Sequence, residues 1–147
     1  MKRIAIILSI VAASAMIFSA CGKYEEGPAF SLATKKARIV GIWTVTEMTV
    51  NGTVQDISYF SGMKTEMKKD GTSVTTVAVF GITISVDGEW RFDDSKEKFE
   101  VRMKDGENWE DWTSSEIIKL TGSELWLRDI ETEAGIEYTT ITKLTKE

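Results

Sequence analysis

The chain has 147 residues with 18 basic and 23 acidic side chains, which gives a formal net charge of −5. This acidic balance argues against nucleic-acid binding, which needs a basic surface. The sequence has no His and a single Cys. These counts exclude Ser-His-Asp and Cys-His catalysis and disfavour zinc and iron–sulfur sites. We therefore predict a protein that is not an enzyme, with no catalytic residues, no metal site and no cofactor.

The first 20 residues have the composition of a secretory signal peptide. Two basic residues at positions 2 and 3 precede an uncharged apolar run over 4–18, and small residues then lead to Cys21. The run is shorter than the ~20 apolar residues that a membrane span needs. We therefore expect residues 1–20 to be removed on export.

Residues 18–21, Phe-Ser-Ala-Cys, resemble the lipobox of bacterial lipoproteins. The resemblance implies that Cys21 becomes the first mature residue and carries a diacylglycerol and an N-acyl chain such as palmitate. Two or more acyl chains hold a protein stably on a bilayer. Gly22 is not the Asp that retains some lipoproteins in the inner membrane, which favours the outer membrane. Residues 23–28 resemble the surface-export signal of Bacteroidota lipoproteins, so surface-exposed and periplasmic orientations both stay open.

Residues 21–29 are expected to form the lipidated N-terminus and a tether, and residues 30–147 are expected to form one domain. The domain opens with a predicted short helix over 30–39, for which Ser31 is placed as the N-cap. Gly41 follows the end of this helix.

From residue 42 onward, apolar and polar residues alternate with a period of two. Ile82, Ile84 and Val86 show this pattern, as do Phe99 and Met103. Such alternation predicts strands with one buried face. Turn signals separate the runs at residues 51–52, 70–71, 87–88, 93–96, 105–106, 122–123 and 134–135. The spacing predicts an all-β fold of eight or nine antiparallel strands in an up-and-down β-barrel, with a two-sheet sandwich as the alternative.

The segment 54–69 is the least regular part of the predicted barrel. It is interpreted as a loop or short strand over one barrel mouth, followed by a strand that leads to the turn at 70–71.

Gly41-Ile42-Trp43 stands between the predicted helix and the first strand. It resembles the Gly-x-Trp signature of lipocalins, in which the Trp plugs the closed end of the barrel. The resemblance implies that Arg128 packs across Trp43. Residues 30–147 also resemble the small lipocalin-like lipoproteins of gut Bacteroidota, through segments 41–43, 87–90, 118–120 and 124–127.

The five tryptophans are the candidate ligand-binding residues: Trp43, Trp90, Trp109, Trp112 and Trp126. Trp43, Trp90 and Trp126 are expected to fill the barrel or to line a cavity in it. Trp109 and Trp112 flank two acidic residues, a pattern typical of sugar-binding and interface surfaces. Positions three apart in one strand face opposite sides, so one of these two is expected in the core and the other outside.

The expected function is non-enzymatic binding of a small apolar or amphipathic ligand by a membrane-anchored lipoprotein. The alternative is a cell-surface module that binds a glycan or a protein through exposed Trp side chains. The paired acids at 93–94 and 110–111 could suggest a carboxylate-based hydrolase, but neighbouring strand residues point to opposite faces and 93–94 lies in a turn.

Overall fold

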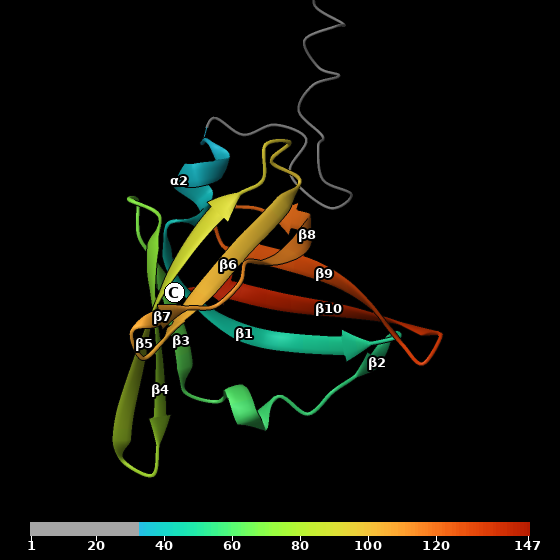
Figure 1. The fold of residues 1–147 in the computed structure, drawn as a ribbon, viewed down its shortest axis with the longest axis horizontal. Helices are drawn as coiled ribbons and strands as arrows, with labels where there is room; N and C mark the ends of the chain where they lie inside the picture. Colours follow the sequence, from blue (N-terminus) through green and yellow to red (C-terminus); the bar gives the residue numbers. More distant parts are fainter. Residues whose placement is uncertain (1–32) are drawn as a thin grey trace, which may run out of the picture.

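The computed structural model describes residues 33–147, so the predicted signal peptide, Cys21, the tether and Ser31 lie outside the described residues. One short helix lies at one end of a β-barrel (Figure 1). The barrel is built from β1 (Gly41–Val50), β3 (Met63–Met67), β4 (Thr72–Val79), β5 (Ile82–Phe92), β6 (Lys98–Asp105), β8 (Thr113–Leu120), β9 (Glu124–Glu133) and β10 (Ile136–Lys146).

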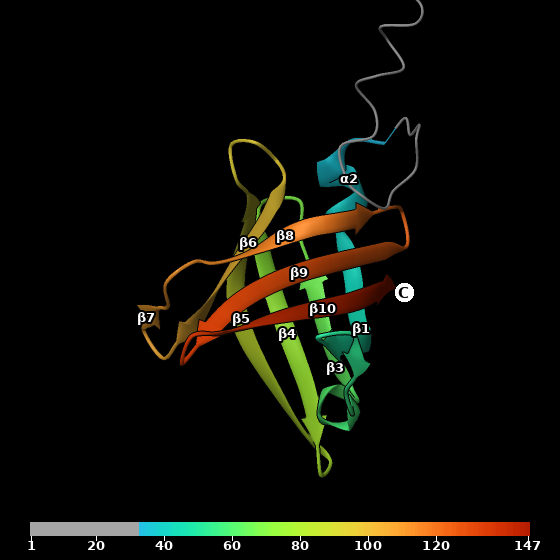
Figure 2. The same ribbon diagram turned by 90° about the vertical axis from the view of Figure 1, so that its right-hand side faces the viewer.

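The strands follow the order β10-β9-β8-β6-β5-β4-β3-β1, and each is antiparallel to its neighbour. β1 also pairs with β10, which closes the barrel (Figure 2). The two-residue strands β2 (Thr53–Val54) and β7 (Asn108–Trp109) extend its rim. The prediction of an up-and-down barrel is confirmed with eight barrel strands, and the sandwich alternative is wrong.

The turn predicted at Asp87-Gly88 is wrong, because this dipeptide lies inside β5. A Cβ built on Gly88 would stand 2.6 Å from the Ser73 hydroxyl oxygen, so the glycine there permits close approach of neighbouring strands. The chain turns instead at Phe80-Gly81, with φ angles of 50° and 79°. The other predicted turns lie between strands as expected, at or next to the residues named.

The helix α2 spans Lys35–Ile39, and its N-cap is Thr34, whose hydroxyl accepts a hydrogen bond of 3.1 Å from the backbone nitrogen of Ala37. No helix within residues 33–147 is long and apolar enough to cross a membrane. The segment 54–69 contains the 3-10 helix η1 (Ser58–Phe60) and then β3, as the prediction of a loop followed by a strand requires. η1 lies at the end of the barrel away from α2 (Figure 1).

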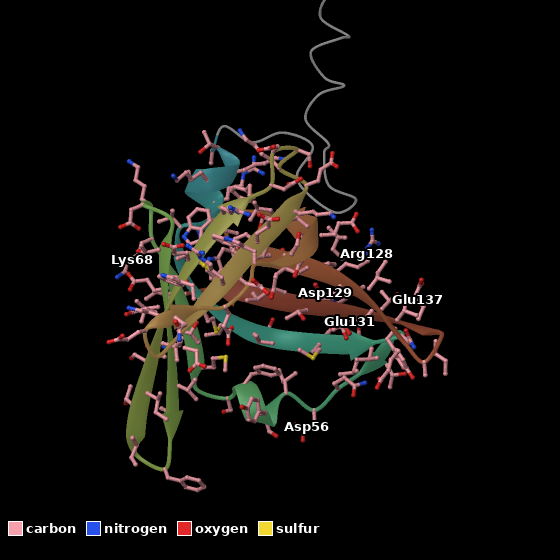
Figure 3. All side chains as sticks on the ribbon, viewed as in Figure 1. Asp56, Lys68, Arg128, Asp129, Glu131 and Glu137 are labelled. Atoms are coloured by element: carbon pink, nitrogen blue, oxygen red, sulfur yellow. The ribbon has the colours of Figure 1, made fainter. Side chains whose placement is uncertain are left out.

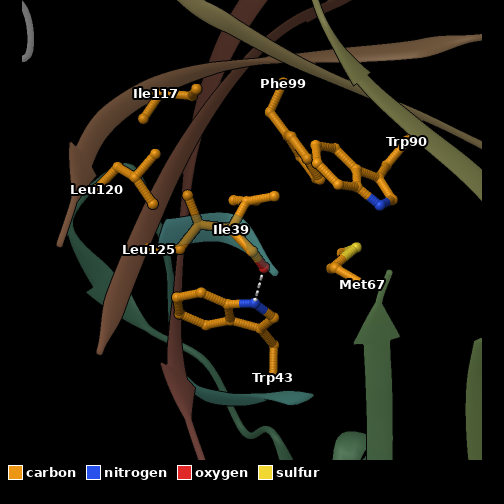
Figure 4. Packing of buried hydrophobic residues seen from close by; sticks show 8 residues of the cluster. All are labelled: Ile39, Trp43, Met67, Trp90, Phe99, Ile117, Leu120 and Leu125. Atoms are coloured by element: carbon orange, nitrogen blue, oxygen red, sulfur yellow. Dashed lines mark hydrogen bonds between the residues drawn. The ribbon is translucent and has the colours of Figure 1, made fainter. Parts of the chain in front are cut away.

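The hydrophobic core lies in the half of the barrel next to α2, whose last residue, Ile39, is part of it. Figure 4 shows how the core side chains pack. The core consists of Ile39, Trp43, Met67, Trp90, Phe99, Ile117, Leu120 and Leu125. We call this half the closed half, and the half that leads to η1 and the β4–β5 turn the open half.

Candidate functional site

Trp43 closes the barrel at the end covered by α2, as the Gly-x-Trp resemblance implies. Its side chain is 1% exposed. The indole nitrogen donates a hydrogen bond of 2.7 Å to the backbone oxygen of Ile39, the last helical residue (Figure 4). The ring therefore fills the barrel floor and also fixes α2 to it.

The cation over the Trp43 ring is Lys146, at 5.0 Å from Nζ to the ring centroid. Its ammonium group donates to the backbone oxygen of Val40 at 2.9 Å and also to that of Arg38. Burial lowers the pKa of Lys146. Gly41 leaves room for this side chain, because a Cβ there would lie 2.9 Å from the Lys146 Cδ.

The expectation that Arg128 packs across Trp43 is wrong. Lys146 is paired with Trp43 across β1 and β10, so both side chains share the inner face. Arg128 follows the inward Leu127 and therefore lies on the outer face, where its Nε donates to Glu116 at 3.0 Å.

Trp90 also packs in the closed half, as predicted. It is 4% exposed, and its ring centroid lies 5.9 Å from that of Phe92 and 6.1 Å from that of Phe99. Its indole nitrogen donates to the backbone oxygen of Lys68 at 3.0 Å. With Trp43, this cluster leaves the closed half filled by side chains.

The open half is different, because side chains on its inner face reach solvent. Strand alternation from Trp90 puts Ile82 and Ile84 on the inner face of β5, and Met103 is paired with the inward Gly88. These three side chains are 65%, 54% and 41% exposed, respectively. Inner-face side chains therefore reach solvent beyond the core, on the side away from α2.

The lining of the open half combines apolar side chains with hydroxyl groups. The inner face includes Val45, Met48 and Leu127, which are half-buried. The Thr65 and Thr75 hydroxyls lie 3.1 Å apart across β3 and β4. Such a surface suits a ligand that is mainly apolar with a few polar atoms.

The rim of the open half is acidic on the β9 side. Pairing with β10 puts Asp129 opposite Thr140 and Glu131 opposite Tyr138 on the inner face. Figure 3 shows these acids along the far part of β9. Among the inward positions of the described strands, the only Lys or Arg is Lys146, at the floor.

Trp126 does not fill the barrel, and that prediction is wrong. The buried Leu125 before it faces inward, so Trp126 faces outward. The ammonium nitrogens of Lys119 and Lys143 lie 4.2 Å and 4.4 Å from its ring centroid, respectively. Lys143 also pairs with Glu47 at 2.7 Å. The site is a charged patch on the outer wall.

Trp109 and Trp112 both contact the outer wall, so the expectation that one lies in the core is wrong. Both rings lie 4.7 Å from the Arg102 guanidinium carbon, and Arg91 lies 4.0 Å from the Trp112 ring. The reason is that residues 110–112 are not in a strand, so strand alternation does not relate the two tryptophans. Trp109 is 41% exposed and lines a surface groove of about 290 Å³ with Lys104.

The acidic pair at 93–94 has the structural role predicted for it. The Asp93 carboxylate accepts backbone hydrogen bonds from Glu97 at 2.9 Å and Lys98 at 2.8 Å and another from the Ser95 hydroxyl. These bonds, the Ser95 one above all, lower the pKa of Asp93 to about 2. Within residues 33–147, no group of three or more acidic, His or Cys side chains could hold a metal ion. The hydrogen bonds that Asp93 accepts therefore stabilise the turn between β5 and β6.

The barrel resembles several solved structures, although no family model and no curated protein sequence matches the chain. Insecticyanin from the tobacco hornworm Manduca sexta aligns with a TM-score of 0.60 and 11% identity, over 84% of this chain and 67% of its own. Apocrustacyanin C1 gives 0.54 and apocrustacyanin C2 gives 0.53, each at 11% identity over 78% of this chain. This chain covers 62% of each apocrustacyanin, just under two thirds of their length. The likeness shows that the fold is lipocalin-like.

Proposed function

We propose that the domain binds a small apolar or amphipathic molecule in the open half of its barrel, without catalysing a reaction. The proposal is carried by the contrast between a fully packed closed half and inner-face residues that reach solvent in the open half. Eight-stranded barrels of this size are either filled by side chains or hold one small ligand. The lipocalin-like fold agrees with the second case.

The acidic rim further defines the expected ligand. Asp129 and Glu131 face inward near the opening, and no inward cation balances them in the open half of the described barrel. These acids would repel a carboxylate on the ligand, whereas they would attract a cationic polar end and accept hydrogen bonds from a neutral one. We expect an apolar molecule whose polar end is neutral or basic.

Displacement of a neutral fluorescent probe, N-phenyl-1-naphthylamine, tests this proposal. Thr142 faces inward opposite Met48, so Thr142→Trp should fill the interior and abolish probe binding. Thr145, on the outer face of the same strand, provides the control Thr145→Trp, which should bind normally. Unchanged binding by the Thr142→Trp protein would exclude the barrel interior as the site.

The same assay tests the charge preference. Dodecylamine should displace the probe at a lower concentration than laurate, and Asp129→Asn should narrow that difference. Equal displacement by both compounds would contradict the acidic-rim argument while leaving ligand binding itself intact.

We also propose that Cys21 is acylated and holds the domain at the outer membrane, facing either the surface or the periplasm. The lipobox-like residues 18–21 support this. Helix α2, the first described element, lies at the closed end (Figure 1). A tether there would leave the open half unobstructed. Incorporation of labelled palmitate into the wild type but not into Cys21→Ser tests the anchor, and protease access on whole cells tests the orientation.

A second candidate is binding of a glycan by the outer wall at Trp109, and the groove beside this exposed ring favours it. Trp109→Ala should then abolish binding on a glycan array. Trp126→Ala, which removes another outer-face aromatic ring, should not. Binding that survives Trp109→Ala would reject this candidate.

A further inference from the structure

β5 has an unpaired edge near the mouth of the barrel. All of β4 pairs with β5, over residues 82–89 of β5. On the other side of β5, β6 pairs only with residues 88–92. Residues 82–87 therefore have a partner strand on one side only. The β4–β5 hairpin projects beyond the body of the barrel (Figures 1 and 2).

The free hydrogen-bonding groups of this edge belong to the odd-numbered residues. The backbone nitrogen of Trp90 donates to the oxygen of Gly71 at 2.8 Å, so the even-numbered residues of β5 face β4. Alternation then turns the N–H and C=O groups of Thr83, Ser85 and Asp87 away from β4. Such a row is a template for another strand.

The sequence does nothing to block this edge. Residues 74–86 contain no charged side chain and no Pro, the two devices that usually protect edge strands. The β9–β10 hairpin offers an internal comparison, because β8 pairs with β9 only as far as Arg128. Beyond that point β9 carries Asp129, Glu131 and Glu133, and Glu137 lies on β10 (Figure 3). One projecting hairpin is protected by charge and the other is not.

Phe80 is the second unusual feature of the β4–β5 hairpin. It is fully exposed and has a φ of 50°, the conformation that Asn51 adopts at 49° in the turn after β1. Asn and Gly suit this position, whereas a bulky side chain there costs about 1 kcal/mol or more. The isolated chain gains no contact from the exposed Phe80 ring that would offset this cost.

We propose that the free edge of β5 pairs antiparallel with the same edge of a second copy of this chain, with the two-fold axis at Ile84. In this register Ile84 faces its own copy, Ile82 faces Val86, and Thr83 faces Ser85. Apolar side chains meet apolar ones on one face, and hydroxyls meet hydroxyls on the other.

The self-complementary register favours a second copy as the occupant, and the absence of charge on residues 74–86 permits the contact. Two copies of a chain with a net charge of −5 repel each other over most of their surfaces. The uncharged segment 74–86 is a place where they can meet without opposing like charges. The same register places Phe80 opposite Gly88 of the second copy, where β5 and β6 separate. The ring would then gain contacts that the single chain does not offer.

A charge-swap experiment on the purified protein tests the dimer. Sedimentation velocity should show a dimer for the wild type and a monomer for Ile84→Lys and for Ile84→Glu, because each puts two like charges face to face across the axis. An equimolar mixture of the two variants should restore the dimer. Ile130→Lys, an equally exposed position on the acid-protected hairpin, is the control and should leave the dimer intact. A wild type that sediments as a monomer, or a mixture that stays monomeric, would overturn the proposal.

Hydrogen exchange locates the contact. Backbone amides of Thr83 and Ser85 should be protected in the wild type and exchange at least tenfold faster in Ile84→Lys, whereas those of Ile84 and Val86, which face β4, should change little. Phe80→Asn suits the turn and should keep the fold while weakening the dimer at least tenfold. A dimer in which the Thr83 and Ser85 amides exchange as fast as in the monomeric variant would place the interface elsewhere and reject the proposal. Ile84 also lines the open half, but sedimentation and hydrogen exchange use no probe, so failure of the dimer and failure of ligand binding can be distinguished.

Discussion

Replacing Trp43 by Phe tests whether the barrel floor holds the fold together. The change removes the indole nitrogen, which leaves the backbone oxygen of Ile39 without its 2.7 Å hydrogen bond, at a cost of about 1–3 kcal/mol. It also removes part of a ring that is only 1% exposed, and the resulting cavity costs about 1–2 kcal/mol more. We expect the free energy of unfolding to fall by about 2–5 kcal/mol, a large share of the ~5–15 kcal/mol of a typical domain.

Urea unfolding followed by circular dichroism measures this loss. With a typical slope of about 2 kcal/mol/M, the urea midpoint should fall by about 1–2.5 M. Trp126→Phe is the matched control, because its ring lies on the outer wall and Phe keeps an aromatic face for Lys119 and Lys143. That variant should lose less than about 1 kcal/mol. Equal midpoints for the two variants would refute the claim that Trp43 is the structural plug.

Three further predictions follow from single contacts. Gly41→Ala should lower the free energy of unfolding, measured by thermal denaturation, by about 1–3 kcal/mol, because the φ of 144° and the Lys146 side chain leave no room for a Cβ. Gly122 has open space around it, so Gly122→Ala should change that free energy by less than about 0.5 kcal/mol. The pKa of Asp93 is about 2 in the folded protein and 3.8 ordinarily, so the ionised side chain stabilises the fold fully above pH 3.8 and loses this contribution as the pH falls through 2. Asp93→Asn should flatten that part of the curve of unfolding free energy against pH. An unchanged curve would contradict the role assigned to Asp93. Arg102→Gln should cost about 1–2 kcal/mol, because Arg102 contacts both Trp109 and Trp112 and its Nε also donates to Glu89 at 2.8 Å. Loss of the tryptophan contacts should also speed hydrogen exchange in residues 106–112. Lys104→Gln, whose cation is 6.0 Å from the Trp109 ring, should speed that exchange less, and equal effects would contradict this role.

The sequence predicts most of the barrel because its turns are local signals. Residues 51–52 and 134–135 adopt the left-handed conformations that their turn type needs. The failure at Asp87-Gly88 has a different origin, because glycine also serves close packing between strands, and only the position of Ser73 reveals which role applies. Phe80-Gly81 lacks the Asn or Asp usual at the first position of such a turn and therefore carries no turn signal.

The sequence alone does not determine where the tryptophans lie, because alternation does not say which face of a strand is inside. In Leu125-Trp126-Leu127 all three residues are apolar, so either parity is consistent with a buried face. Irregular pairing between Val45 and Glu47, and between Ile117 and Lys119, also changes the phase within a strand. Lys146 could not be distinguished from other candidate cations, since its place over Trp43 depends on the pairing of the first strand with the last.

That pairing has a consequence for how the chain folds. Most neighbouring strands are joined by short connections, but β1 and β10 meet with Trp43 opposite Lys146, at opposite ends of the described sequence. Pairing such distant segments carries the largest entropic cost of loop closure of any strand pair in the barrel, because that cost grows with the length of the intervening chain. We therefore expect the hairpins to form early and the seam between β1 and β10 to form last. A high contact order, meaning many contacts between residues far apart in sequence, is typical of slow folding. The barrel cannot close until the residues around Lys146 are in place.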